Sequence, residues 1–221
     1  MIVLAIDTAG VDCSAALYDS AGGQVLSVVT DAIGKGHAER LMAVIDEALE
    51  EAGLALQSVG RVAVVIGPGS FTGIRVGVAA ARGLALVLGV DCVGVTTLET
   101  LAQRYLVDHP DKPVLAAMDA KRNEVYTQAF SSAGEPLTEP AALSPDEVSA
   151  LAEELGAALT GSWATSPEER LRDAFEGRDR FDIRTVARLG AQKPVDGQRP
   201  KPLYLRGPDA KPQTGFALAR A

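Results

Sequence analysis

Short runs of apolar residues open the chain, and their spacing predicts three β-strands. Ile2–Ile6 is apolar throughout, as in a strand that is buried on both faces. Two more strands are predicted at Cys13–Tyr18 and Gln24–Val29, with a turn of small and polar residues at 19–23 between them. Because short connections join antiparallel neighbours, the three strands are expected to form an antiparallel meander.

From residue 37 onward the spacing becomes helical. In His37–Ala52, apolar residues recur at every third or fourth position and form one stripe, and Gly53 ends the segment. Strands and helices then alternate, with strands predicted at Val62–Ile66 and Asp91–Val95 and helices at Ile74–Leu88 and Thr97–Val107. Three antiparallel strands followed by this alternation are typical of the ribonuclease-H-like half of actin-type proteins, whereas a Rossmann fold alternates from its start.

The second half of the chain has a weaker pattern. The segment 108–113, with its Asp and Pro residues, is typical of a linker. Beyond it, we predict two strands and a helix, at Val114–Met118, Glu124–Phe130 and Asp146–Leu155. Residues 168–188 are charged and irregular, and the Pro-rich tail from Lys193 onward is expected to be mobile.

These elements predict an α/β protein with a two-lobe actin-like, ribonuclease-H-like fold. Its mixed sheets would contain three antiparallel strands and then β-α alternation. Residues 1–107 would form the N-terminal actin-like lobe, and residues 108–221 a second, smaller actin-like lobe with the Pro-rich tail.

Charge and composition narrow the classes of partner. The chain has 221 residues and a formal net charge of −8. Because an acidic protein repels the phosphate backbone, we expect weak direct binding of tRNA or other nucleic acids. Cys13 and Cys92 lie in apolar runs and are expected to be buried and reduced. The longest apolar stretch, Val76–Val90, contains Arg82 and is shorter than the roughly 20 residues of a membrane span, and no signal-peptide pattern is present, so we predict a cytoplasmic protein.

Asp7 and Thr8 follow the first strand and are candidate nucleotide-binding residues. In actin-type ATPases an acidic residue at this place contacts the metal–nucleotide, and the backbone of the next hairpin surrounds the phosphates. Such a turn usually has Gly two positions after the Asp, but here Ala9 stands there and Gly10 comes one residue later. The alternative is that Asp7 only organises the turn through its side chain. Binding of ATP or ADP, if retained, is therefore expected to be weak or vestigial.

The segment GPGSFTGIR, residues 67–75, connects a predicted strand to a predicted helix. Backbone N–H groups at such a turn, together with the helix dipole, can bind an anion, so Gly67, Gly69 and Ser70 join the nucleotide-binding candidates. The spacing is not that of a Walker P-loop, because no Lys follows the last Gly. A structural connection with Ser70 or Thr72 as the helix cap explains the same residues.

The helix predicted at Ile74–Leu88 is apolar around nearly its whole circumference, with only Arg75 and Arg82 charged. Such a helix is expected to be buried on more than one side. We expect the sheet to cover one side and a partner protein to cover another, with the helix at His37–Ala52 sharing the contact. An internal core is the alternative. The residues expected at the interface are Leu41, Ile45, Gly73, Gly77, Val78 and Ala81.

Histidines are too few and too scattered to indicate a metal or catalytic site. Only His37 and His109 occur, with no His-x-x-x-His or Cys-x-x-Cys pattern, whereas a catalytic metal usually has about three protein ligands. We therefore predict no catalytic residues and no metal, and we interpret His37 as a structural residue at a helix start.

Several of these segments together resemble the TsaB family, also called YeaZ. They are AIDTAG at 5–10, CSAALYD at 13–19, GHAERLMAVIDEAL at 36–49, VVIGPGSFTGIRVGVAAARGLAL at 64–86, AMDAKRNEVY at 117–126 and YLR at 204–206. The resemblance runs in order over residues 1 to about 130 and more faintly to Arg206. Its most specific part is GPGSFTGIR followed by a helix rich in Gly and Ala.

This resemblance implies an actin-like fold and a role in placing threonylcarbamoyl on adenosine 37 of certain tRNAs. Members of the family are non-catalytic partners of the paralogous transferase TsaD, whose His-x-x-x-His metal site this sequence lacks, and the ATPase TsaE joins the complex. We therefore expect a heterodimer with TsaD, contact with TsaE, a competing homodimer, tRNA reached only through the complex, and no membrane. The alternatives are a small-molecule kinase or ATPase of the same fold, or a glycoprotease-like protein.

Overall fold

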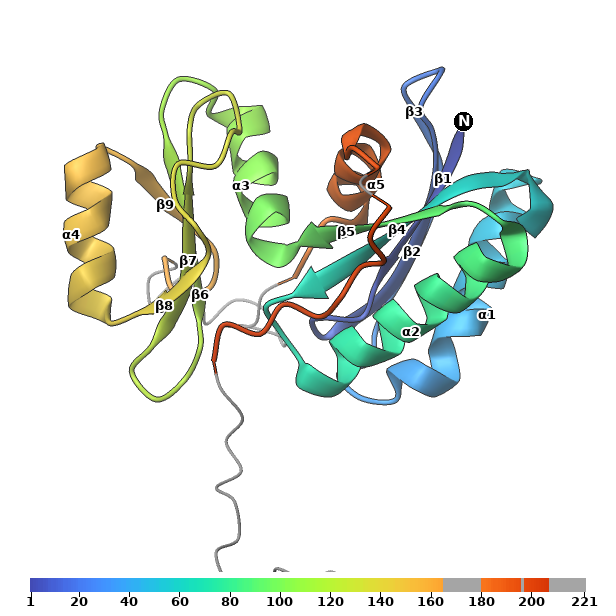
Figure 1. Cartoon of the computed structure of the whole chain (residues 1–221), viewed down its shortest axis with the longest axis horizontal. Helices are drawn as coiled ribbons and strands as arrows, with labels where there is room; N and C mark the ends of the chain where they lie inside the picture. Colours follow the sequence, from blue (N-terminus) through green and yellow to red (C-terminus); the bar gives the residue numbers. More distant parts are fainter. Residues whose placement is uncertain (165–179, 196, 207–221) are drawn as a thin grey trace, which may run out of the picture.

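Two β-sheets form the framework of this chain in the computed structural model, which describes residues 1–164, 180–195 and 197–206 (Figure 1). The larger sheet has five strands in the order β3-β2-β1-β4-β5. Its strands are β1 (Ile2–Asp7), β2 (Asp12–Asp19), β3 (Gln24–Ala32), β4 (Val59–Gly67) and β5 (Asp91–Thr96).

The first three strands of the larger sheet pair as the sequence predicts. β1 pairs antiparallel with β2 and β2 with β3, whereas β4 runs parallel to β1 and β5 parallel to β4. Parallel neighbours need a long crossover, and the connections contain the helices α1 (His37–Ala52) and α2 (Phe71–Leu88). The predicted fold class, a mixed α/β fold of the actin-like, ribonuclease-H-like type, is confirmed.

Helices cover both faces of the five-stranded sheet. α1 and α2 lie on one face, and α5 (Ile183–Gln192) packs on the other (Figure 1). Successive residues of a strand point to opposite faces, and β4 shows the division. A Cβ on Gly77 of α2 would lie 3.5 Å from Val64, whereas a Cβ on Gly190 of α5 would lie 2.2 Å from Ala63. The sheet is therefore enclosed by helices from widely separated parts of the chain.

The smaller sheet has four strands in the order β8-β7-β6-β9. Its strands are β6 (Val114–Asp119), β7 (Val125–Phe130), β8 (Ala141–Leu143) and β9 (Ala158–Thr160). The two faces of β6 contribute to different apolar clusters. Ala116 belongs to the cluster that contains Leu98 of α3 (Thr97–Asp108), whereas its neighbour Leu115 packs in a second cluster with Val148 of α4 (Pro145–Leu155). Through α3, the apolar core of the larger sheet continues into the smaller one.

Capping side chains mark where the predicted helices begin. Ser70 rather than Thr72 caps α2, since the Ser70 hydroxyl accepts the N–H of Gly73 at 3.2 Å. At the start of α3, Thr96 and Glu99 form a capping box in which each side chain accepts the other residue's backbone N–H. Ser144 and Glu147 repeat this arrangement at α4. These polar residues were visible in the sequence, and the predicted helices accordingly match the observed ones closely.

Helix α5 corrects the prediction that residues 168–188 are irregular. Asp182 caps the helix by accepting the N–H of Arg184 at 3.2 Å and the hydroxyl of Thr185 at 2.9 Å. Its buried residues follow helical spacing but include Thr and Gly, which weaken the apolar pattern; they are Ile183, Thr185, Val186, Ala187 and Gly190. Residues 168–179 of the same prediction lie outside the described residues. The division of the chain at residue 107 stays a prediction, and α5, which comes after that point, packs on the first sheet.

Residues 197–206, here called the C-terminal strap, run from the larger sheet to the smaller one (Figure 1). The N–H of Leu203 donates to the carbonyl of Ile66 in β4 at 2.8 Å. Further along, Arg206 donates to the carbonyl of Ala120 at 3.1 Å and to the carboxylate of Glu124. The tail from Lys193 onward was expected to be mobile, but the strap within it is held by hydrogen bonds at both sheets. Such bonds depend on partners far away in sequence, so the local pattern could not indicate them. Residues 196 and 207–221 of that prediction lie outside the described residues.

Helix α2 is long and apolar enough, by length and composition alone, to cross a membrane, and it is the one described helix that passes this test. The sequence analysis, which began the apolar stretch at Val76, did not expect this result. A single such helix is weak evidence, because helices that pack on a protein core pass the same test.

Candidate functional site

The turn after β1 and the loop before α2 lie directly against each other. The backbone N–H of Ser70 donates to the carbonyl of Ala9 at 2.7 Å, and the hydroxyl of Thr8 donates to the carbonyl of Gly73 at 2.7 Å. These bonds join two segments that are more than 60 residues apart. The structure thus brings Asp7 and Thr8 to the loop that contains Gly69 and Ser70.

Two glycines make this close contact sterically feasible. A Cβ at Gly69 would lie 2.5 Å from the carbonyl oxygen of Ala9, and a Cβ at Gly73 would lie 1.9 Å from the carbonyl oxygen of Thr8. Both distances are far below van der Waals contact, so a side chain at either position would push the two segments apart. Gly67, at the end of β4, instead faces Ile74 and the carbonyl of Leu203, and its φ is 99°. The glycines of this loop therefore serve to pack α2 on the β1–β2 turn and on the C-terminal strap.

Asp7 is completely enclosed by this packing, with an exposed fraction of 0%. Its Oδ1 accepts the N–H of Ala9 at 2.8 Å, but its Oδ2 has no hydrogen-bond partner among the described residues. Burial raises the pKa of Asp7 to about 7, and the negative charge of nearby Asp12 adds to the effect. Ser14, which lies opposite Asp7 in the β1–β2 register, has a buried hydroxyl that is likewise unpartnered within the described ranges.

We expect the substitution Asp7→Asn to change how stability depends on pH. Because the pKa of Asp7 is raised from 3.8 to about 7, the folded protein holds this proton more tightly than the unfolded chain does. Its stability should therefore decline as the pH rises from 3.8 to about 7 and stay level above that. The Asn variant lacks this ionisation. When the pH is raised from about 5 to about 8, its free energy of unfolding should therefore rise relative to that of the wild type by on the order of 2 kcal/mol. Urea unfolding at the two pH values measures the gain.

Asp46→Asn is the matched control, because it removes the same charge from an exposed position on α1. It should show no comparable gain relative to the wild type. Parallel pH profiles for the wild type and Asp7→Asn would show that Asp7 does not ionise in this range in the folded protein.

A metal-bound nucleotide does not fit this turn as it stands. Asp7 and Thr8 have exposed fractions of 0% and 1%, and of the five candidates only Gly69 and Ser70 are exposed. The hydroxyl of Ser70 is already engaged as the cap of α2. A nucleotide could contact Asp7 only if α2 moved away from the turn. The nucleotide-binding role of these residues stays a prediction.

The histidines lie apart from this turn. His37 is buried at the start of α1, with Nε2 3.2 Å from the carbonyl oxygen of Asp12. His109 is exposed and stacks on the ring of Tyr105. Within residues 1–164, 180–195 and 197–206, no three His, Cys, Asp or Glu side chains are grouped as ligands of a metal ion would be.

The residues predicted for a partner interface require a correction. All six are buried within this chain, because the faces of α1 and α2 that carry them turn toward the sheet; they are Leu41, Ile45, Gly73, Gly77, Val78 and Ala81. A Cβ on Gly77 would lie 2.5 Å from the hydroxyl oxygen of Thr8, so the small residues of α2 admit the chain's own β1–β2 turn rather than another helix. These side chains cannot contact a partner in this structure.

The opposite face of α2 exposes large apolar side chains. Phe71, Leu86 and Val87 have exposed fractions of 56%, 67% and 82%. Exposed residues recur along the helix every three or four positions and form what we call the α2 stripe: Phe71, Arg75, Ala79, Arg82, Gly83, Leu86 and Val87. Met42 of the neighbouring α1 is also exposed, at 47%. An apolar surface of this kind is typical of a protein contact.

One end of the α2 stripe carries an aromatic cluster that the sequence analysis did not single out. The guanidinium of Arg75 lies 3.7 Å from the ring centroid of Phe71, and its Nε donates to the Tyr204 hydroxyl at 2.8 Å. The rings of Phe71 and Tyr204 are 5.4 Å apart. The available signal was Phe71 itself, a large aromatic residue inside a Gly-rich loop where no core position was expected.

This chain is similar to known proteins along much of its length. A family model described as TsaD, tRNA N6-adenosine threonylcarbamoyltransferase, matches residues 21–173. The Escherichia coli protein named tRNA threonylcarbamoyladenosine biosynthesis protein TsaB is 37% identical over 126 residues, covering 57% of this chain and 53% of that protein. The Bacillus subtilis protein of the same name is 34% identical over 130 residues, covering 59% and 55%. This chain thus spans about half the length of these curated relatives.

Other relatives match along nearly the whole chain. An uncharacterized protein of Mycobacterium tuberculosis is 32% identical over 211 residues, which cover 95% of this chain and 94% of that protein. A crystal structure from Pseudomonas aeruginosa, described as an uncharacterized protein with similarity to peptidase YEAZ, matches with a TM-score of 0.75 and 29% identity over 93% of this chain and 99% of that one. YeaZ from the same organism matches with a TM-score of 0.59 and 35% identity, covering 66% and 68%.

Proposed function

This chain belongs to the family described as TsaD, tRNA N6-adenosine threonylcarbamoyltransferase, and from that premise we propose that it is a non-catalytic subunit of the machinery that makes N6-threonylcarbamoyladenosine at position 37 of tRNA. In this role it binds TsaD, the transferase, and activates it. The names of the Escherichia coli and Bacillus subtilis relatives, both threonylcarbamoyladenosine biosynthesis proteins, support the proposal.

The α2 stripe is the observation that carries the proposal of a binding role. Large apolar side chains that stay in water lose the stabilisation that burial would give them, roughly 25 cal/mol for each Å² of apolar surface. The stripe exposes three of them on one helix, and the neighbouring α1 exposes Met42. The natural partner for such a surface is another pair of helices, packed at an interaxial distance of about 8–10 Å. We propose that TsaD offers this pair and that a second copy of this chain competes for the same stripe.

The packing of the β1–β2 turn supports a non-catalytic role. In a catalytic relative of this fold, an acidic residue at the position of Asp7 must reach the metal–nucleotide. Here Asp7 has no exposed surface, and the start of α2 is hydrogen-bonded across the turn. A subunit that binds a partner and catalyses no reaction does not require Asp7 to be accessible to a nucleotide.

Two measurements test the proposed function. The first is co-purification of this chain with TsaD, where we expect a complex of defined stoichiometry. The second is a tRNA modification assay with TsaD and TsaE, in which omission of this chain should remove most of the product. If modification proceeds equally well without it, the proposed role is wrong.

The remaining proposals concern the other members of the complex. We propose that TsaE joins the complex that this chain forms with TsaD, and that tRNA is bound by the complex and not by this chain alone. The formal net charge of −8 supports the second point, because phosphate neutralisation needs Lys and Arg. Submicromolar binding of tRNA by the isolated chain at near-physiological salt would contradict it.

A small-molecule kinase or ATPase is the second candidate function. It is favoured by the proximity of Asp7 and Thr8 to Gly69 and Ser70, which matches the arrangement of a nucleotide site in outline. Turnover of ATP by the purified chain, in the absence of any partner, would support this candidate. A glycoprotease-like activity would instead appear as cleavage of a protein substrate that a metal chelator abolishes.

A further inference from the structure

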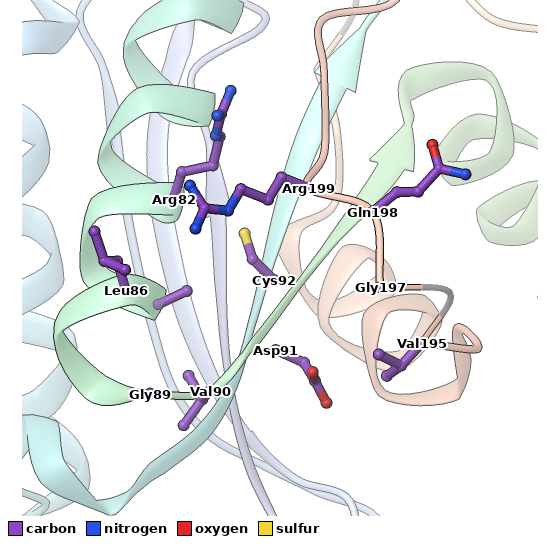
Figure 2. A pocket seen from close by; sticks show the side chains of 11 residues that line it. Arg82, Leu86, Gly89, Val90, Asp91, Cys92, Val195, Gly197, Gln198 and Arg199 are labelled. Atoms are coloured by element: carbon purple, nitrogen blue, oxygen red, sulfur yellow. The ribbon is translucent and has the colours of Figure 1, made fainter.

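A small hollow lies beside the C-terminal half of α2, away from the β1–β2 turn. It has a volume of about 260 Å³ and is bounded by α2, by the start of β5, and by Val195 and residues 197–199 (Figure 2). Its polar lining is unusual for an acidic protein, because two arginines from distant parts of the chain, Arg82 and Arg199, border the same small space.

The two arginines are available to a ligand. Neither guanidinium makes a hydrogen bond or an ion pair with any described residue, whereas several other arginines of this chain, such as Arg40 and Arg104, are paired with carboxylates. In Figure 2, the guanidinium of Arg199 extends across the hollow toward α2 and lies between Arg82 and the sulfur of Cys92. Two positive groups that border one small hollow repel each other, and an anion bound there would weaken the repulsion.

The other groups at this end of the hollow are uncharged. Burial raises the pKa of the Cys92 thiol to about 11, although nearby Arg82 opposes the effect, so the thiol stays protonated at neutral pH. Leu86, Val90 and Val195 give the hollow an apolar wall. Asp91 lines the opposite side, and its carboxylate is directed away from the arginines in Figure 2. The hollow therefore has a positive end, an apolar wall and a negative far edge.

We propose that this hollow binds the phosphate group of a small phosphate monoester, with Arg82 and Arg199 as its ligands and the organic part of the ester against Leu86, Val90 and Val195. A carboxylate has two oxygen atoms, and one arginine can donate hydrogen bonds to both. A phosphate dianion has more oxygen atoms and twice the charge, so it can bind two arginine side chains at once. The negative edge at Asp91 disfavours a second phosphate, which limits the ligand to one. Arg82 and Leu86 also belong to the α2 stripe, so the hollow adjoins the proposed partner surface. The test uses the isolated full chain and measures anion binding alone, so its outcome does not depend on the proposed partner.

Isothermal titration calorimetry at low salt tests the site with three probes: inorganic phosphate, phenyl phosphate and acetate. We expect binding of inorganic phosphate, tighter binding of phenyl phosphate because its ring reaches the apolar wall, and no measurable binding of acetate. Arg82→Gln and Arg199→Gln should each weaken phosphate binding at least about tenfold, as expected for the loss of hydrogen bonds to a charged group. Both side chains are exposed, so neither change endangers folding.

Arg188→Gln is the matched control. It removes the same charge from an exposed position on α5, which does not line the hollow, and should leave phosphate binding unchanged. Three results would each overturn the proposal: no binding of either phosphate at millimolar concentration, equal weakening by Arg188→Gln, or acetate binding as tight as phosphate binding.

Alkylation of Cys92 locates the bound probe. Cys92 is half-buried at the hollow, whereas Cys13 is fully buried in the core, so a maleimide should react with Cys92 first. Saturating phenyl phosphate should slow this reaction several-fold in the wild type and leave it unchanged in Arg199→Gln. Binding that leaves the alkylation rate of the wild type unaltered would place the anion elsewhere and contradict the proposed site.

Discussion

Gly73→Ala is expected to lower the free energy of unfolding by roughly 3 kcal/mol or more, a large loss for one methyl group. The added Cβ would lie 1.9 Å from the carbonyl oxygen of Thr8. The carbonyl belongs to the backbone and the position of a Cβ is set by the backbone, so no side-chain rotation relieves the contact. Relief requires α2 to shift from the β1–β2 turn, which would stretch the hydrogen bond from the Thr8 hydroxyl to the Gly73 carbonyl. Urea unfolding of both proteins measures the difference.

Gly83→Ala is the control within the same helix. Gly83 is exposed, and a Cβ there would meet nothing within 4 Å. The substitution should therefore stabilise the protein by about 0.5–1 kcal/mol, the usual advantage of Ala over Gly in a helix. Opposite signs for the two substitutions would establish that α2 packs on β1 as described. A similar small effect at both positions would show that Gly73 does not face the turn.

Val87→Glu is expected to weaken association with the proposed TsaD partner by at least about 30-fold, equivalent to roughly 2 kcal/mol. Val87 has an exposed fraction of 82% and belongs to the α2 stripe, so a carboxylate there would be buried without a counter-charge in the complex. The folded monomer should be unaffected, because the side chain already lies in water. Co-purification and a binding titration measure the loss, and the melting temperature checks the fold.

Val107→Glu separates the interface from the general effect of a new surface charge. Val107 on α3 has an exposed fraction of 67% and lies outside the α2 stripe. This variant should bind the partner as the wild type does. Equal binding by both variants would mean that another surface holds the partner. Any homodimer should respond to Val87→Glu as the heterodimer does, if the two compete for one surface.

Local signals were sufficient for the helices near the start of the chain. α1 has the predicted bounds, His37–Ala52, because its single apolar stripe and the glycines on either side are both local features. The antiparallel pairing of β1, β2 and β3 followed from the short connections between them. β8 and β9, at three residues each, are too short for any periodicity to appear, and both are held mainly by their neighbours in the sheet.

The orientation of α2 could not be predicted in the same way. Its sequence is apolar on nearly every side, and the small residues at 73 and 77 suit a contact with any close backbone. Only the fold shows that this contact is with the chain's own β1–β2 turn, through Thr8, which lies 65 residues before Gly73. The sequence analysis therefore predicted an interface helix and selected its buried face. Because the apolar residues of α2 do not form a single stripe in the sequence, the sequence alone does not distinguish the buried face of this helix from its exposed face.

The position of α5 has a consequence for the order in which the protein can be completed as it is synthesised. β1 to β5 are synthesised before α5. The face of the sheet that carries Ala63 is covered by α5, residues 183–192. Arg61 of β4 also donates a hydrogen bond to the carbonyl of Gly190, which lies 129 residues later in the chain. Until α5 has been synthesised, one apolar face of the sheet stays exposed to solvent in the nascent chain, and exposed apolar surface favours aggregation. A circular permutant that begins with α5 would supply the cover before the sheet and should depend less on chaperones during its synthesis.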